Sequence, residues 1–210
     1  MEENRISKKV LVLMGSPRKH GNCDRLSDEF IRGAEEKGCQ TEKIYLREKN
    51  IKDCLGCCAC QKNGGVCVQK DDMQEIYEKM KEADVIALAS PVYFYTWTAL
   101  MKRAIDRTIA VEASLTNKTF YLISAGQAPD EQYMATMIDS FHQYIGCFRG
   151  EGNREGGYVF GYGTDKPGDV EGSKAMDRAY LLGHGIKSIC QADEPNSLLE
   201  AYYKRSFRCS

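Results

Sequence analysis

The stretch of sequence that decides the fold reads Val10-Leu-Val-Leu-Met-Gly-Ser-Pro-Arg-Lys-His-Gly-Asn22. Its first five residues are all apolar, which is typical of a parallel strand that is buried on both faces. A short loop follows, and residues 22–37 then predict a helix with Asn22 as its N-cap and Gly38 as its stop. A buried strand that runs through a tight loop into a helix is the opening half of a β–α–β unit.

Short apolar runs alternate with amphipathic stretches along the rest of the chain. The apolar runs predict four further strands, at residues 41–46, 84–89, 118–124 and 157–162. The amphipathic stretches predict helices at residues 98–109, 130–145 and 169–187, and two more that begin with capping boxes, Asp72 with Glu75 and Ser197 with Glu200. Five β–α units predict an α/β fold, a flavodoxin-like doubly wound sheet of five parallel strands in the order 2-1-3-4-5. Its ligand is expected at the carboxyl ends of the strands.

We expect one domain across residues 1–210, with two segments outside the repeating pattern. Residues 47–70 form a cysteine-rich loop insertion, and residues 188–210 form a C-terminal extension. Lys plus Arg number 29 and Asp plus Glu number 30, so the net charge gives no sign of a surface that binds nucleic acid or an anionic membrane. No apolar run reaches the roughly 20 residues that cross a bilayer, and the first run is too short for a signal peptide. We therefore expect a cytoplasmic protein whose partners include neither nucleic acid nor membrane.

The loop after the first strand has the composition of a phosphate site. Such a loop presents free backbone N–H groups and the positive end of a helix dipole to a ligand. Ser16 adds a hydroxyl, Arg18 a forked cation and Asn22 an amide, and Gly21 lets the backbone approach closely. The loop lacks the Lys-Ser/Thr ending of a nucleoside-triphosphate loop and the three glycines of a dinucleotide fingerprint. One phosphate monoester is therefore the best fit, and an ordinary turn is the alternative.

Aromatic residues are concentrated in the loop after the third predicted strand, which reads Ser90-Pro-Val-Tyr-Phe-Tyr-Thr-Trp97. Its three aromatic rings and the indole of Trp97 can form a wall on which a flat aromatic ligand stacks. The alternative is a packed loop or a contact between subunits.

Ten cysteines is a high number for a chain that is expected to be cytoplasmic, and five of them fall within fourteen residues. Cys54, Cys57, Cys60 and Cys67 have the spacing C-x2-C-x2-C-x6-C. Three closely spaced thiolates can wrap one side of an iron–sulfur cubane, and the fourth can close the other side. Cys58 is outside this pattern. Zinc is less favoured because zinc knuckles usually stand further apart. Free thiols, or a redox disulfide between Cys54 and Cys57, are the third alternative.

The two ligand loops together resemble a known family. Gly15-Ser-Pro-Arg-x-x-Gly-Asn22 and Ala89-Ser-Pro-Val-Tyr-Phe94 are similar to the flavin loops of the NAD(P)H-dependent FMN reductase family. Ser124–Gln127 and Gly161–Asp169 resemble later segments of the family more loosely, and the likeness runs from residue 8 to residue 187. It implies a flavodoxin-like fold and noncovalent FMN, bound by Ser16, Arg18, Gly21, Asn22, Cys23, Pro91, Val92, Tyr93, Phe94, Ser124 and Gly126. The family usually has Ser or Thr where this chain has Cys23.

The cysteine spacing resembles the compact motif of the iron–sulfur flavoproteins, a branch of the same family. The resemblance implies that Cys54, Cys57, Cys60 and Cys67 ligate one 4Fe–4S cluster that exchanges electrons with FMN.

The favoured function is an FMN-dependent oxidoreductase that transfers electrons between NAD(P)H, as co-substrate, or a reduced carrier and an acceptor. No catalytic residue is assigned, because the flavin performs the electron chemistry. The alternatives are an electron carrier without a small-molecule substrate, a cluster-free NAD(P)H:flavin or quinone reductase, and a structural metal loop on a flavin-free scaffold. Aromatic residues in 93–97 and in the tail (Tyr202, Tyr203 and Phe207) favour a homodimer or homotetramer.

Overall fold

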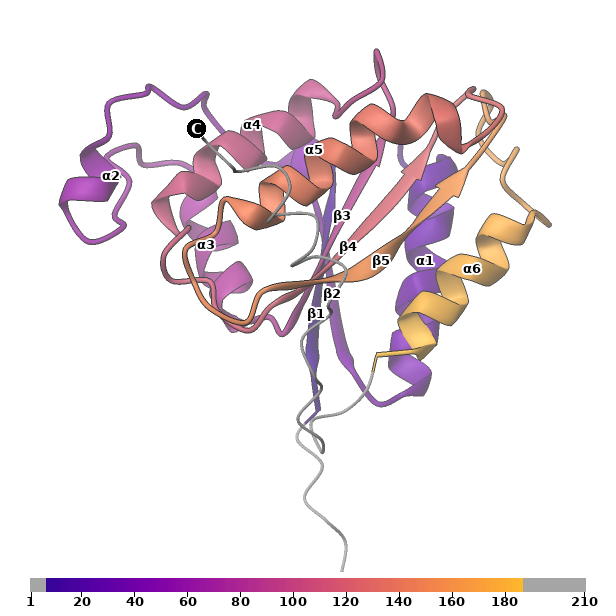
Figure 1. The fold of residues 1–210 in the computed structure, drawn as a ribbon, viewed down its shortest axis with the longest axis horizontal. Helices are drawn as coiled ribbons and strands as arrows, with labels where there is room; N and C mark the ends of the chain where they lie inside the picture. The colour runs from indigo at the N-terminus through magenta and orange to yellow at the C-terminus, as the bar shows by residue number, and fades with distance from the viewer. Residues whose placement is uncertain (1–6, 187–210) are drawn as a thin grey trace, which may run out of the picture.

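A parallel β-sheet forms the centre of the protein, and helices cover both of its faces (Figure 1). The computed structural model describes residues 7–186. The five strands follow the order β2-β1-β3-β4-β5 and every neighbouring pair is parallel, which confirms the predicted flavodoxin-like fold. The strands are β1 Lys9–Met14, β2 Gln40–Tyr45, β3 Val85–Pro91, β4 Thr119–Ala125 and β5 Arg154–Gly161.

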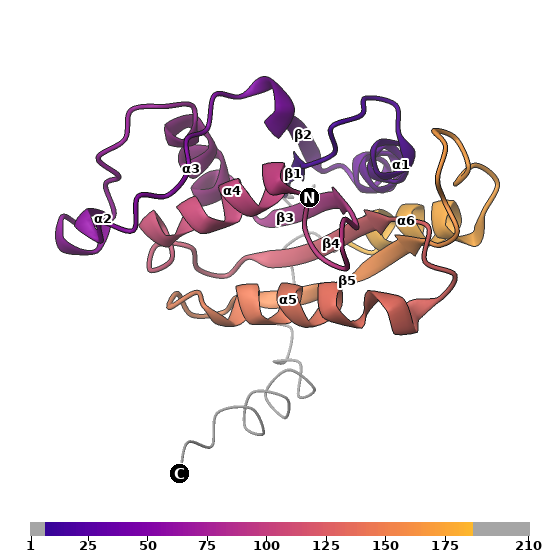
Figure 2. The same ribbon diagram turned by 90° about the horizontal axis from the view of Figure 1, so that it is seen from above.

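Two layers of helices bury the two faces of the sheet, as Figure 2 shows from above. Successive side chains of β1 alternate between these layers, so that Val12 and Leu13 belong to the two opposite cores. Within residues 7–186, no helix is both long enough and apolar enough to cross a bilayer. The helices are α1 Asn22–Glu36 and α6 Lys174–His184 on one face, and α3 Met73–Glu82, α4 Ala99–Arg107 and α5 Ala135–Gly146 on the other.

The structure corrects two predicted helix caps. Asn22 begins α1, but its side chain does not cap the helix because it is bound to residues that follow β5. The predicted capping box of Asp72 and Glu75 is wrong as well. Asp72 Oδ2 accepts the backbone N–H of Asn50 at 2.7 Å, and Glu75 pairs with Lys49. Both acidic side chains therefore fasten the cysteine-rich loop to the start of α3.

The boundaries of the last two described elements also differ from the prediction. β5 begins at Arg154 rather than at residue 157. α6 begins at Lys174 rather than at residue 169, because residues 162–173 form a loop that is tied to the start of α1.

One short helix was not predicted. α2, Ala59–Lys62, lies inside the cysteine-rich loop, and this loop projects from one side of the molecule in both views (Figures 1 and 2). The predicted helix near Ser197 and the extension at 188–210 lie outside the described residues. The described part also contains the 3-10 helices η1 Leu46–Glu48, η2 Thr108–Ala110 and η3 Glu131–Met134.

α1 and α6 pack closely because glycines stand where the helices touch. A Cβ atom on Gly183 of α6 would lie 1.9 Å from the Phe30 carbonyl oxygen, and one on Gly33 of α1 would lie 2.3 Å from the Tyr180 carbonyl oxygen. Both distances are far inside van der Waals contact, so any larger side chain would push the helices apart. The glycines therefore allow the close contact between α1 and α6.

Candidate functional site

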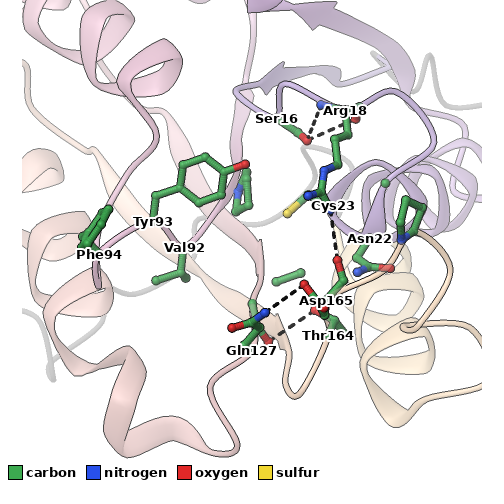
Figure 3. Close-up of a pocket in the computed structure, with 15 residues that line it drawn as sticks. Ser16, Arg18, Asn22, Cys23, Val92, Tyr93, Phe94, Gln127, Thr164 and Asp165 are labelled. Atoms are coloured by element: carbon green, nitrogen blue, oxygen red, sulfur yellow. Dashed lines mark hydrogen bonds between the residues drawn. The ribbon is translucent and has the colours of Figure 1, made fainter.

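A cavity of about 380 Å³ opens at the carboxyl ends of the strands (Figure 3). Its volume falls within the usual range for cofactor sites. It lies between the β1–α1 loop (residues 15–21) with the start of α1, the loops that follow β3 and β4, and a segment after β5. The lining residues are Ser16, Arg18, Gly21, Asn22, Cys23, Pro91, Val92, Tyr93, Phe94, Ala125, Gly126, Gln127, Thr164, Asp165 and Pro167.

The predicted flavin contacts all line this cavity except Ser124. Ser124 is fully buried within β4, and its hydroxyl donates to the Ser90 carbonyl oxygen at 2.7 Å. From this part of the chain, only Ala125 at the end of β4 and the residues Gly126 and Gln127 line the cavity. The only sequence signal for the lining after β5 was the loose resemblance at Gly161–Asp169. The lining residues that the prediction omitted are Ala125, Gln127, Thr164, Asp165 and Pro167.

The β1–α1 loop is held in shape by its own side chains. Ser16 Oγ accepts the Arg18 N–H and donates to the Arg18 carbonyl oxygen, both at 3.1 Å (Figure 3). His20 has a φ of +56°, which is uncommon for a residue with a Cβ atom, and its N–H donates to Asp24 Oδ2 at 2.7 Å. The first-turn N–H groups of α1 have no acceptor inside the helix. The loop therefore has the features of a preformed anion site.

Two of the predicted phosphate ligands also hold the segment after β5. Arg18 Nη1 donates to the Asp165 carbonyl oxygen at 3.0 Å. Asn22 Nδ2 donates to the Lys166 carbonyl oxygen at 3.0 Å, and Asn22 Oδ1 accepts the Gly168 N–H at 3.0 Å. These contacts bring the segment against the β1–α1 loop, where it forms the last wall of the cavity.

Asp24 is a fully buried carboxylate directly behind this loop. Besides the His20 N–H, it accepts hydrogen bonds from Lys43 Nζ at 2.7 Å and from the Tyr45 hydroxyl at 2.9 Å. Burial raises the pKa of Asp24, but the hydrogen bonds from Lys43, from the His20 N–H and from Tyr45 outweigh it and hold the pKa below its usual value. The carboxylate is therefore charged at neutral pH and fixes the strained end of the loop.

Cys23 brings a thiol to the cavity wall. Burial raises the pKa of this thiol to about 12, so it is neutral at neutral pH. A neutral thiol donates hydrogen bonds only weakly. Cys23 therefore adds bulk to the wall but little polarity.

The aromatic loop (residues 91–97) turns sharply and exposes the rings of Tyr93, Phe94 and Tyr95. Tyr93 and Thr96 exchange two backbone hydrogen bonds at 3.0 and 3.2 Å, and Phe94 and Tyr95 both have positive φ values, +48° and +66°. The Phe94 side chain is 97% exposed. Figure 3 shows Tyr93 and Phe94 on one side of the cavity, across from Arg18.

Trp97 and the residue after it belong to the core instead. Trp97 is 5% exposed, and its Nε1 donates to Ser140 Oγ at 2.7 Å, so the expectation that it forms part of an aromatic wall is wrong. Thr98 caps α4, and its hydroxyl donates to the Gly15 carbonyl oxygen at 2.7 Å, while its N–H donates to Ser90 Oγ at 3.2 Å. The aromatic loop is thereby tied to the β1–α1 loop.

A second cavity, of about 50 Å³, lies in the cysteine-rich loop. The eight cysteines within the described residues are free thiols. Among the same residues, no three His, Cys, Asp or Glu side chains are arranged to hold a metal ion. The predicted ligands nevertheless share this one cavity, and its cysteines are Cys54, Cys57, Cys58, Cys60 and Cys67.

Two arginines anchor this loop to α4. Arg103 Nε lies 2.8 Å from Asp53 Oδ1 at the surface. Arg107 and Asp71 form a buried pair, with side chains that are 1% and 0% exposed and an Nη1 to Oδ2 distance of 2.7 Å. The loop is therefore fixed at both of its ends, although little regular secondary structure forms between them.

The sequence of this chain matches a known family over most of the sheet. Residues 8–145 match the NADPH-dependent FMN reductase family. This chain belongs to that family, in its iron–sulfur flavoprotein branch. An iron–sulfur flavoprotein of Archaeoglobus fulgidus is 34% identical over 185 residues, which cover 85% of this chain and 78% of the relative. One of Methanocaldococcus jannaschii is 38% identical over 139 residues, 65% of this chain and 71% of the relative. The protein is accordingly an FMN oxidoreductase.

Solved structures share the fold at lower sequence identity. The NAD(P)H:quinone oxidoreductase from Methanothermobacter marburgensis superimposes with a TM-score of 0.69 at 15% identity, over 90% of this chain and 100% of that one. The likeness supports the flavodoxin-like arrangement of strands and helices described above.

Asp24 should make the stability of the protein depend on pH. Because its folded pKa lies below the unfolded value of about 3.9, its stabilising effect is present above that pH and is lost as the pH falls through the folded pKa. Asp24→Asn should therefore lower the free energy of unfolding at neutral pH and flatten its fall in acid, as measured by urea unfolding over a pH series. Asp28→Asn, an exposed partner of the same Lys43, is the control and should change little. Identical pH profiles for Asp24→Asn and the wild type would contradict this assignment.

Proposed function

We propose that the protein passes electrons between NAD(P)H, or a reduced carrier, and an acceptor by means of FMN bound in the larger cavity. The observation that supports this most directly is the two-ended chemistry of that cavity. One end is the β1–α1 loop, with the Arg18 cation and the N-terminus of α1, and the other end is bordered by exposed aromatic rings. FMN matches both ends, because its phosphate monoester and its flat ring lie at opposite ends of the ribityl chain.

The β1–α1 loop would hold the phosphate. Arg18 can give a charge-assisted hydrogen bond, and the Ser16 hydroxyl and the first N–H groups of α1 can give neutral ones. A Cβ atom at Gly21 would lie 3.3 Å from Arg18 Cβ, so any other residue would crowd the loop at the phosphate. Asn22 would contribute mainly indirectly, by holding the segment after β5 in place as a wall of the cavity.

The loops after β3 and β4 would border the flavin ring. Val92 and Gly126 lie close together there, since a Cβ atom on Gly126 would be 3.4 Å from Val92 Cβ. Tyr93 and Phe94 add aromatic surface, and a ring bound against Phe94 would remove apolar area from water. FMN supplies the hydride and electron chemistry when it is bound, and the side chains of this chain bind and orient it.

A 4Fe–4S cluster on Cys54, Cys57, Cys60 and Cys67 is the second part of the proposal. The donor set fits such a group, because the four thiols are soft ligands that line one common cavity and have the sequence spacing C-x2-C-x2-C-x6-C. The iron–sulfur flavoproteins among the relatives support the same assignment. The cluster supplies one-electron transfer when it is bound, and Cys58 is not needed as a ligand.

An electron carrier without a small-molecule substrate is the second candidate function. Apolar side chains of the cysteine-rich loop favour it, because Leu55, Val66 and Val68 are 67%, 53% and 51% exposed and offer a surface to a protein partner. Oxidation of NADH or NADPH with a quinone acceptor would support the enzyme, and reduction by a ferredoxin alone would support the carrier. A homodimer or homotetramer stays a prediction, to which the exposed rings of Phe94 and Tyr95 lend support.

Arg18→Ala should weaken FMN binding by about 1.5–3 kcal/mol, since it removes a charge-assisted hydrogen bond. This is roughly a 10- to 150-fold rise in Kd, and quenching of flavin fluorescence in a titration of the apoprotein measures it. Lys19→Ala removes the next cation along the chain, which pairs with Glu48, and should change Kd by about twofold or less. Colourless wild-type protein that takes up no added FMN would overturn the flavin proposal.

Anaerobic reconstitution with iron and sulfide should give about four irons per chain. The iron should be lost in Cys57→Ala and kept in Cys58→Ala, because only the first cysteine belongs to the proposed ligand set. Iron and sulfide analysis of the wild type, Cys57→Ala and Cys58→Ala measures this. Zinc in place of iron, or wild-type protein that binds no metal, would contradict the cluster and leave a flavin reductase without one.

A further inference from the structure

Arg107 is the largest fully buried side chain of the described residues, and it lies against the cysteine cavity. It is the last residue of α4 and reaches under the cysteine-rich loop. Its Nη1 donates to the Lys52 carbonyl oxygen at 2.8 Å and to Asp71 Oδ2 at 2.7 Å. Its Nη2 donates to Asp71 Oδ1 at 3.1 Å and lies 3.4 Å from Cys67 Sγ.

These contacts do more than join α4 to the cysteine-rich loop. Lys52 and Asp71 stand at the two ends of the cysteine-rich segment, so one guanidinium ties both ends together. Burial of an arginine and an aspartate is costly, and a pair of apolar side chains would hold the same two segments at no such cost. The feature that apolar packing cannot reproduce is the N–H group directed at Cys67.

The neighbouring anchor shows that the contact with Cys67 is specific. Arg103, one helical turn earlier on α4, also pairs with an aspartate of the loop, Asp53. That pair is exposed, with side chains 37% and 85% accessible, and Arg103 does not line the cysteine cavity. Of these two arginines of α4, Arg107 alone combines a buried positive charge with an N–H group beside a cysteine.

We propose that Arg107 is a positioning residue that holds Cys67 at the cavity wall and raises the reduction potential of the group bound there. The proposal rests on the iron–sulfur assignment made above. A hydrogen bond to a ligand sulfur, and a positive charge near it, stabilise the more negative, reduced form of a thiolate-bound cluster. Asp71 offsets part of that charge and keeps the guanidinium fork in the orientation that points Nη2 at Cys67.

Potentiometric titration of the reconstituted protein, with dithionite as reductant and the cluster's visible absorbance as readout, tests this. Arg107→Lys keeps the charge but loses the fork, so its midpoint should move to lower potential. Asp71→Asn removes the negative charge and keeps a donor at Cys67, so its midpoint should move to higher potential. A merely structural role would not move the two midpoints in opposite directions.

Arg103→Lys is the matched control and should leave the midpoint unchanged. Iron content and thermal melting are measured for each variant, and if Arg107→Lys does not fold, the test rests on the upward shift of Asp71→Asn. Wild-type protein with about four irons but variants with unchanged midpoints would overturn the role of Arg107 alone. Wild-type protein that binds no iron would overturn the cluster and this role together. Failure of both variants to fold would also overturn it, because the pair would then serve the fold.

Discussion

The hydrogen bond from the Thr98 hydroxyl to the Gly15 carbonyl oxygen, at 2.7 Å, joins two of the loops that form the larger cavity. Gly15 also continues the β1–β3 ladder, because its N–H donates to the Ala89 carbonyl oxygen at 2.7 Å. Thr98 in turn begins α4 by accepting the Met101 N–H. A Cβ atom at Gly15 would lie 2.7 Å from Met101 Cβ, so α4 can approach this point only because residue 15 is a glycine. One contact thus fixes the central strand, both loops and α4 relative to one another.

Local sequence patterns predict the parts of the molecule that neighbouring residues decide. Val10–Met14 is apolar at every position, so its place in a parallel sheet as a strand buried on both faces follows without any tertiary information. The β1–α1 loop is equally local, because its turn residues, its cation and the helix that follows are contiguous. The burial of the Ser124 and Trp97 side chains could not be predicted, for the opposite reason. Whether they face a ligand or the core depends on distant partners, Ser90 and Ser140.

Contacts between distant segments also overrode the local capping rules. Asn22 was expected to cap its own helix, but its amide is satisfied by Lys166 and Gly168, well over a hundred residues away. The spacing of the cysteines identifies a candidate ligand set, because all four lie within fourteen residues of sequence. No sequence pattern marks Arg107 and Asp71, whose pairing depends on how α4 lies beside the cysteine-rich loop.

A comparison of FMN with riboflavin on the same apoprotein is the most direct test of the two-ended cavity. Riboflavin has the flavin ring and the ribityl chain of FMN but lacks the phosphate. If the β1–α1 loop binds that phosphate, riboflavin should bind roughly 100-fold more weakly or worse, because at least one charge-assisted contact and several backbone contacts are lost. Quenching of flavin fluorescence measures both affinities. Equal affinities for the two flavins would contradict a phosphate site at the start of α1.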